Sequence, residues 1–121
     1  MDPYKLGEME ELFAQLIWKH EPVSSHTLTE LCDEAFNWKR TTTYTMLRRL
    51  CDRELFQNIN GTVTSLMSEA DFRAGQGEQF LNETFEGSLP QFFAAFTRRN
   101  KLSKKEIHEI QQLIDEHREG Y

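Results

Sequence analysis

Apolar residues recur at helical spacing through the first part of the chain. The first run predicts an amphipathic helix over residues 6–17. Its apolar residues, which recur at helical spacing, are Leu6, Met9, Leu12, Phe13, Leu16 and Ile17. After Pro22, Ser24 or Ser25 can cap a second, short helix that ends near residues 36–38. The predicted apolar face of that helix consists of Leu28, Leu31, Cys32 and Ala35.

A third helix is predicted from Arg40 to Arg53, with one apolar side and one polar side. The apolar side consists of Thr43, Met46, Leu47, Leu50 and Cys51. The centre of the polar side is formed by Thr41, Thr45 and Arg48, and the residues that flank it are Thr42, Tyr44 and Arg49. Five hydroxyl-bearing residues in a row, from 41 to 45, are unusual for a helix selected only for stability.

Two strand patterns follow, over residues 55–59 and 62–66, and Asn60-Gly61 between them suits a type I′ hairpin turn. Three helices and then a hairpin are the order of a winged helix-turn-helix, whose third helix enters the major groove of DNA. We therefore predict a mainly α fold with a small β-hairpin wing. The winged-helix DNA-binding domain is predicted over residues 1–68, and a helical dimerisation domain over residues 69–121.

The predicted dimerisation domain has capping-box spacings at Ser68, Ser88 and Ser103, which predict three further helices. About fifty residues cannot easily bury so many large apolar side chains within one copy of the chain. A homodimer is the simplest way to cover them. The predicted dimerisation residues are Phe80, Phe85, Leu89, Phe92, Phe93, Phe96, Ile107, Ile110, Leu113 and Ile114.

The charge of the chain is unevenly distributed. A net charge of −6 argues at first against a nucleic-acid partner. Residues 37–53 nevertheless carry five basic residues against Asp52 alone, a net of +4, which leaves −10 for the rest. One basic face fits a protein that meets phosphates with a single element. The predicted DNA-binding residues are Lys39, Arg40, Thr41, Thr42, Tyr44, Thr45, Arg48 and Arg49.

Other classes of protein lack support in the sequence. No apolar run approaches the ~20 residues that cross a bilayer, and the first residues lack the order of a signal peptide, so we expect a cytoplasmic protein with no membrane association. Cys32 and Cys51 form no CxxC motif, and the spacings of the four histidines build no recognised metal site. Because no nucleophile, acid–base or phosphate-loop arrangement emerges, we predict neither enzymatic activity nor a cofactor.

Four stretches of the chain together resemble one family. They are residues 6–18, Trp38 with 41–50, residues 87–89 and residues 101–107. In order and spacing they are similar to the penicillinase-repressor family of bacterial winged-helix regulators, of the BlaI/MecI/CopY type. The resemblance implies a homodimeric repressor that binds an inverted-repeat operator. It also implies that Thr41, Thr42 and Tyr44 face the bases.

The chain departs from the family pattern at several positions. Lys39-Arg40 stands where members commonly have Ser-Pro, and no Lys or Arg occurs between Arg53 and Arg73 to give the wing a backbone contact. Penicillin-response repressors are released by cleavage of an Asn-Phe bond, and Ala95-Phe96 is the aligned pair. Residues 117–121 lack the cysteine-rich motif of the copper-responsive branch, so we expect no copper sensing through it. Release by proteolysis, ligand or partner stays open.

Two other interpretations compete with operator binding. In the first, a winged-helix protein-interaction module uses Tyr44, Arg48 and Arg49 to dock on an acidic protein, and the acidic chain stays off DNA. The wing without basic residues favours this alternative. In the second, the chain is an enzyme subunit or a metal sensor, which requires a bound metal or cofactor.

Overall fold

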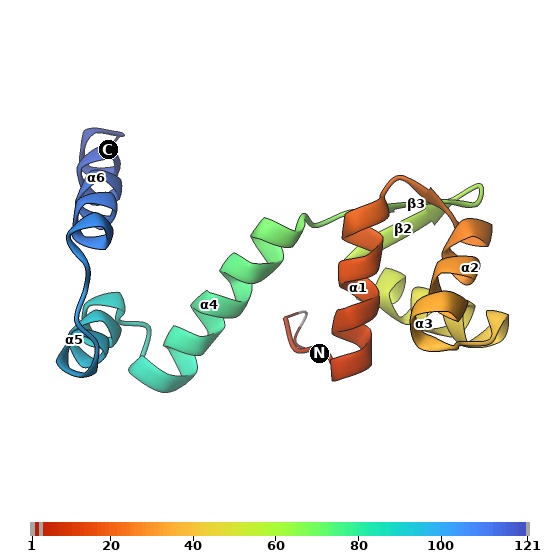
Figure 1. Cartoon of the computed structure of the whole chain (residues 1–121), viewed down its shortest axis with the longest axis horizontal. Helices are drawn as coiled ribbons and strands as arrows, with labels where there is room; N and C mark the ends of the chain where they lie inside the picture. The colour runs from red at the N-terminus through yellow and green to blue at the C-terminus, as the bar shows by residue number, and fades with distance from the viewer. Residues whose placement is uncertain (1, 3, 121) are drawn as a thin grey trace. The chain divides into compact units, whose positions relative to one another are not determined.

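The described part of the chain forms six helices and a small sheet, and the first three helices and the sheet follow the order of a winged helix (Figure 1). The computed structural model describes residues 2 and 4–120 of the chain. The helices are α1 (Glu8–His20), α2 (Ser25–Phe36), α3 (Arg40–Asp52), α4 (Glu69–Phe85), α5 (Leu89–Arg99) and α6 (Lys104–Gly120). The strands are β1 (Val23–Ser24), β2 (Phe56–Ile59) and β3 (Thr62–Ser65), which form an antiparallel sheet in the order β1-β3-β2. The predicted fold class is confirmed.

Local side-chain chemistry sets several of these boundaries. The Ser24 hydroxyl accepts a hydrogen bond from the backbone N–H of Thr27 at 2.9 Å and so caps α2. Asn37 ends that helix in the left-handed conformation, with φ of 56°. In the hairpin, Asn60 and Gly61 have φ of 51° and 82°, the positive values that a type I′ turn needs. The predicted cap and turn therefore both form.

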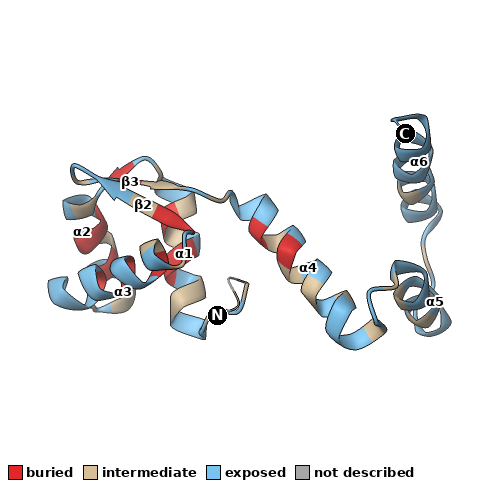
Figure 2. Ribbon diagram, turned by 180° about the vertical axis from the view of Figure 1, so that it is seen from behind, coloured by how far each residue is buried: buried red, intermediate tan, exposed pale blue. Residues whose placement is uncertain are grey.

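The chain divides into two compact units, one ending at Gln79 and the other beginning at Phe80. The buried core lies in the first unit, and it includes Phe13, Ile17, Leu28, Leu50, Leu55, Phe56, Val63 and Phe72. Figure 2 shows buried segments in α1, α2, α3, the sheet and the first part of α4, and none in α5 or α6. The division falls inside α4, whereas the predicted domain boundary lies at residue 68.

Three residues of the predicted apolar faces are exposed. Met9 and Leu12 in α1 are 41% and 40% exposed, and Ala35 in α2 is also exposed. Helix α1 turns Phe13, Ala14 and Ile17 inward, so its buried stripe is narrower than the apolar spacing predicted. The prediction was wrong at these residues because periodicity alone does not say how wide a face the neighbouring elements cover.

The first turns of α4 pack on the first unit through aromatic side chains. Phe72 is fully buried, and its ring centroid lies 5.4 Å from that of Trp18 and 5.9 Å from that of Tyr4. The indole N–H of Trp18 donates a hydrogen bond to the Met67 carbonyl at 3.0 Å. Arg73 pairs with Glu11 of α1, and this hydrogen-bonded contact raises the pKa of the Arg73 guanidinium. The start of α4 is thus held to the first unit by apolar and charged contacts together.

Arg53 serves the fold of the amino-terminal segment. Its guanidinium donates hydrogen bonds to the carbonyls of Asp2 and Lys5 and lies 3.7 Å from a carboxylate oxygen of Glu10. Only 13% of its side chain is exposed. Counting Arg53 with the basic face of residues 37–53 was therefore wrong. Arg53 follows the polar side of α3 in the sequence, but its side chain turns to backbone carbonyls of the amino-terminal segment.

Gly75 of α4 provides a sharp test of this packing. A Cβ added there would lie 2.0 Å from the ring of Tyr4, whereas a Cβ at Gly77, two residues further on, meets nothing within 4 Å. We expect Gly75→Ala to lower the free energy of unfolding by about 1 kcal/mol or more through steric overlap. Gly77→Ala should raise it by up to about 1 kcal/mol, because alanine is the better helix former.

The contact between Gly75 and Tyr4 provides an internal control. In a Tyr4→Ala background the ring that blocks a Cβ is gone, so Gly75→Ala should there behave like Gly77→Ala. Urea unfolding of the four variants measures the coupling between the two sites. Equal effects of Gly75→Ala with and without the Tyr4 ring would contradict the packing described for α4.

Candidate nucleic-acid interface

All eight predicted DNA-binding residues lie on the exposed side of α3 or at its start. They are Lys39, Arg40, Thr41, Thr42, Tyr44, Thr45, Arg48 and Arg49. The opposite side of the helix is buried, through Thr43, Met46, Leu47 and Leu50. The core therefore fixes the rotation of α3 about its own axis, and this rotation brings the predicted residues together on one solvent-facing surface, which we call the α3 face.

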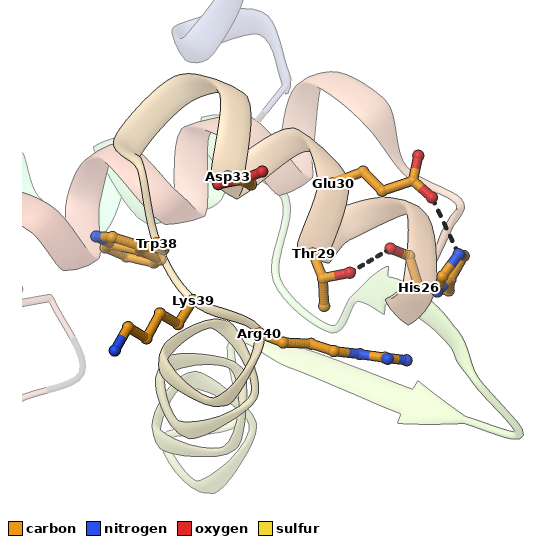
Figure 3. A pocket seen from close by; sticks show the side chains of 7 residues that line it. All are labelled: His26, Thr29, Glu30, Asp33, Trp38, Lys39 and Arg40. Atoms are coloured by element: carbon orange, nitrogen blue, oxygen red, sulfur yellow. Dashed lines mark hydrogen bonds and ion pairs between the residues drawn. The ribbon is translucent and has the colours of Figure 1, made fainter.

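The turn before α3 places two cations at the beginning of the helix. Lys39 is the N-cap residue but makes no side-chain cap, and Arg40 is the first helical residue. In Figure 3 their side chains extend from the turn in different directions, beside an open pocket of about 430 Å³. The remaining lining comes from α2 and the turn: His26, Thr29, Glu30, Asp33 and Trp38.

The lining of this pocket is mixed in charge and locally bonded. His26 lies 3.0 Å from a carboxylate oxygen of Glu30, and the Thr29 hydroxyl donates to the His26 carbonyl at 2.6 Å. Glu30 and Asp33 also bring negative charge to the edge of the α3 face. Lys39 and Arg40 are thus the groups in this turn that can bind a phosphate. The two nearby carboxylates reduce the positive electrostatic potential around them.

Tyr44 connects α3 to the start of α2. Its hydroxyl lies 3.4 Å from the Ser25 hydroxyl, to which it donates a long hydrogen bond. Stabilisation of the phenolate by Ser25, with a smaller contribution from nearby Arg40, lowers the pKa of Tyr44 from its usual value. The backbone N–H of Ser25 in turn donates to the Gly61 carbonyl at 2.8 Å. The α3 face, the start of α2 and the hairpin turn therefore adjoin one another.

The other side chains of the α3 face interact only locally. The Thr45 hydroxyl donates to the Thr41 carbonyl at 2.9 Å, one turn back, and Arg49 contacts the sulfur of Met46 at 3.7 Å. Among the described residues no ion pair ties Arg48 or Arg49 to a carboxylate. Both guanidinium groups can consequently bind an anionic ligand without first giving up a charged partner inside the protein.

The wing differs from the α3 face in its chemistry. Its tip carries Asn58, Ile59 and Asn60 in exposed positions, and Ile59 is 56% exposed. The segment from residue 54 to residue 72 holds no Lys or Arg. A backbone contact by this wing would therefore rely on amide groups and the main chain rather than on charge.

The structure also bears on alternative chemistry. Within residues 2 and 4–120, no cluster of three or more His, Cys, Asp or Glu side chains is placed to hold a metal ion. Burial raises the pKa of the Cys32 thiol and also that of the less deeply buried Cys51, and both cysteines are free thiols. In the same part of the chain, no helix is both long and apolar enough to span a bilayer.

Sequence reasoning missed Ser25 as a member of this surface. The sequence suggests Ser25 only as a possible helix cap, and the cap is Ser24. The contact of Ser25 with Tyr44 depends on the two-residue strand β1, which pairs Val23 with Val63 and Ser24 with Thr62 and so brings the start of α2 to the hairpin. A strand that short has no recognisable alternation, and the sequence carried no sign of it.

The fold and the α3 face together define a winged-helix protein of the transcription-regulator class. A profile of the penicillinase repressor family matches residues 6–116, and the chain belongs to this family of transcriptional repressors. The chain is 27% identical to the penicillinase repressor of Bacillus licheniformis over 118 residues, which cover 94% of this chain and 92% of the relative. The predicted family is confirmed.

Proposed function

We propose that this repressor binds an inverted-repeat operator in double-stranded DNA as a homodimer, with the α3 face of each copy in the major groove. The observation that carries the proposal is the α3 face itself: eight polar or basic residues, all exposed, on a helix whose other side is fixed in the core. Threonine and tyrosine side chains can contact base edges and thymine methyls, and Arg48 and Arg49 can contact phosphates or guanine.

The dimer in this proposal is supported by the second unit. None of the described residues from 80 to 120 is buried within one chain. The apolar residues most exposed there are Leu113 at 64% and Leu89 at 60%, followed by Ile107, Ile114, Phe80, Phe96 and Phe93. Phe80, Phe85 and Phe92 contact one another, with ring centroids 5.5–6.0 Å apart, but these contacts leave the apolar surface uncovered. A second copy supplies an equal surface to cover it.

Selection of binding sites from random duplexes by the purified full chain tests the function. Two recognition helices on a two-fold axis should enrich a symmetric motif whose half-sites are centred about one helical turn, ~34 Å, apart. Enrichment of no motif, with no retention of duplex at low salt, would contradict operator binding. That result would favour the protein-interaction module, for which the wing without basic residues is the supporting observation.

Disrupting the second unit should separate dimerisation from base recognition. We expect Leu113→Glu with Ile114→Glu to yield monomers in sedimentation velocity, because two charges cannot be buried unpaired in an apolar interface. Affinity for the symmetric operator should fall by roughly 100-fold or more, since the two half-sites would no longer be bound by linked domains. Glu116→Gln, an exposed change on the same helix, is the control and should leave both measurements unchanged.

A further inference from the structure

A second concentration of positive charge lies at the junction of α5 and α6. Five of the chain's 14 Lys and Arg residues fall within residues 98–105, and no Asp or Glu interrupts them. They are Arg98, Arg99, Lys101, Lys104 and Lys105, and we call this stretch the 98–105 basic segment. In a chain of net charge −6, the segment is at least as positive as the α3 face, and base recognition by α3 does not account for it.

The five side chains are exposed and largely without internal partners. Within the part of the chain that the structure describes, the single ion pair of the segment joins Lys105 to Glu109 at 3.9 Å, with the Lys105 side chain 85% exposed. An exposed pair of this kind contributes little to stability. Stabilising contacts within the described fold therefore do not explain why five cations lie in this segment.

The cations of the 98–105 basic segment differ in their effect on helix stability. Arg98 and Arg99 lie in the last turn of α5, where positive charge stabilises a helix. Lys104 and Lys105 open α6, where positive charge opposes the helix dipole. Ser103 and Glu106 form the capping box that starts α6, through hydrogen bonds of 3.0 and 3.1 Å. The two lysines thus stand where folding disfavours them, which points to a role in binding an anion.

The composition of the segment indicates which polyanion it suits. Protein interfaces bury an apolar centre, but Leu102, already half-buried, is the one apolar residue among residues 98–105. Binding of a nucleic-acid backbone needs no apolar centre, since it is driven by cations that displace counterions from phosphates. The wing of this chain has no Lys or Arg to bind phosphates in this way. We propose that the 98–105 basic segment binds the phosphate backbone of duplex DNA, outside base recognition.

This inference rests on the proposed function and deepens it. Its test uses a duplex without an operator, so that failure of backbone binding by the 98–105 basic segment can be distinguished from failure of operator recognition. The variant is Lys104→Gln with Lys105→Gln in the full chain. The matched control is Lys19→Gln with Arg118→Gln, which removes the same charge from exposed positions elsewhere. The probe is a duplex of scrambled sequence, about four helical turns long so that it can span both copies of a dimer, and the dissociation constant is measured at several salt concentrations.

We expect the variant to bind the scrambled duplex at least about 10-fold more weakly than the control at low salt. The slope of log affinity against log salt should fall by about 0.9 for each phosphate that the variant no longer neutralises. Helix content should be unchanged or higher, because two charges that oppose the dipole are gone. Any operator motif selected by the α3 face should stay the same.

Three results would overturn the inference. The first is an affinity and a salt slope equal to those of the control, and the second is failure of the unmodified protein to bind the duplex at low salt. In the third, the variant binds DNA as before but forms a weaker dimer, which would assign the lysines to carboxylates of the second copy. The first and third results leave the proposed operator binding intact. Conversely, the proposed function fails alone when the protein binds the scrambled duplex but selects no sequence.

Discussion

Reversing the charge of Arg48 and Arg49 should reduce operator binding by at least about 100-fold, because loss of an arginine contact to a base typically costs about 1–3 kcal/mol and the new carboxylates repel phosphate. Both side chains lie on the α3 face and make no ion pair within the described residues, so the change to glutamate leaves no carboxylate without its partner. Fluorescence anisotropy with a labelled operator, followed at several salt concentrations, measures the reduction in affinity.

The control for this variant is Lys19→Glu, an exposed change near the end of α1. It alters the net charge in the same direction but lies away from the α3 face, and it should change affinity only slightly. The single variants refine the assignment. Arg48→Ala should weaken binding in a salt-dependent way, and Thr42→Ala or Tyr44→Phe should mainly change the preferred sequence. Unchanged affinity and salt slope for Arg48→Ala would show that α3 is placed wrongly on the DNA.

The second large effect concerns the stability of the first unit. Phe72→Ala should lower its free energy of unfolding by about 3–5 kcal/mol, the usual cost of deleting a fully buried phenyl ring. The ring packs against Trp18 and Tyr4, so its removal also releases the start of α4. Since a domain of this size has about 5–15 kcal/mol of stability in total, much of the first unit should unfold at moderate denaturant.

Leu66→Ala provides the comparison for Phe72→Ala. Leu66 is 55% exposed and precedes α4 by a few residues, so its truncation removes little buried area and should cost about 1 kcal/mol or less. Urea midpoints of the two variants, measured by far-ultraviolet circular dichroism, provide the readout. Similar midpoints would mean that the start of α4 is not part of the cooperative unit to which Phe72 is assigned.

The class of fold could be read from the sequence because its strongest signals are local. The apolar side of α3, the Asn60-Gly61 turn and the serine caps each depend on neighbouring residues. The apolar side and the turn have the predicted form, and each capping serine accepts a hydrogen bond from a backbone N–H, with the reciprocal bond of a full capping box at Ser103. The orientation of the α3 face followed from the same periodicity. These elements were predictable because short-range sterics and capping chemistry, rather than distant partners, decide them.

What the sequence could not supply depends on residues far apart in the chain. Arg53 looked like part of a basic face, yet it bonds to the carbonyls of Asp2 and Lys5, about fifty positions away. Gly75 shows its role only in the folded chain, where the ring of Tyr4 lies against it. Strand β1 was missed because two residues carry no period. The roles assigned to the α3 face and to the second unit remain predictions that the proposed experiments test.

The two tryptophans of the chain lie in separate aromatic clusters of the first unit. Trp18 packs against Phe56 and Phe72, beside the start of α4, whereas Trp38 packs against Phe13 and Phe36, beside the turn that leads into α3. Replacing either tryptophan with phenylalanine would therefore leave a protein with a single tryptophan fluorophore. Emission from Trp18 would report the docking of α4, and emission from Trp38 would report events at the α3 face, without any external label.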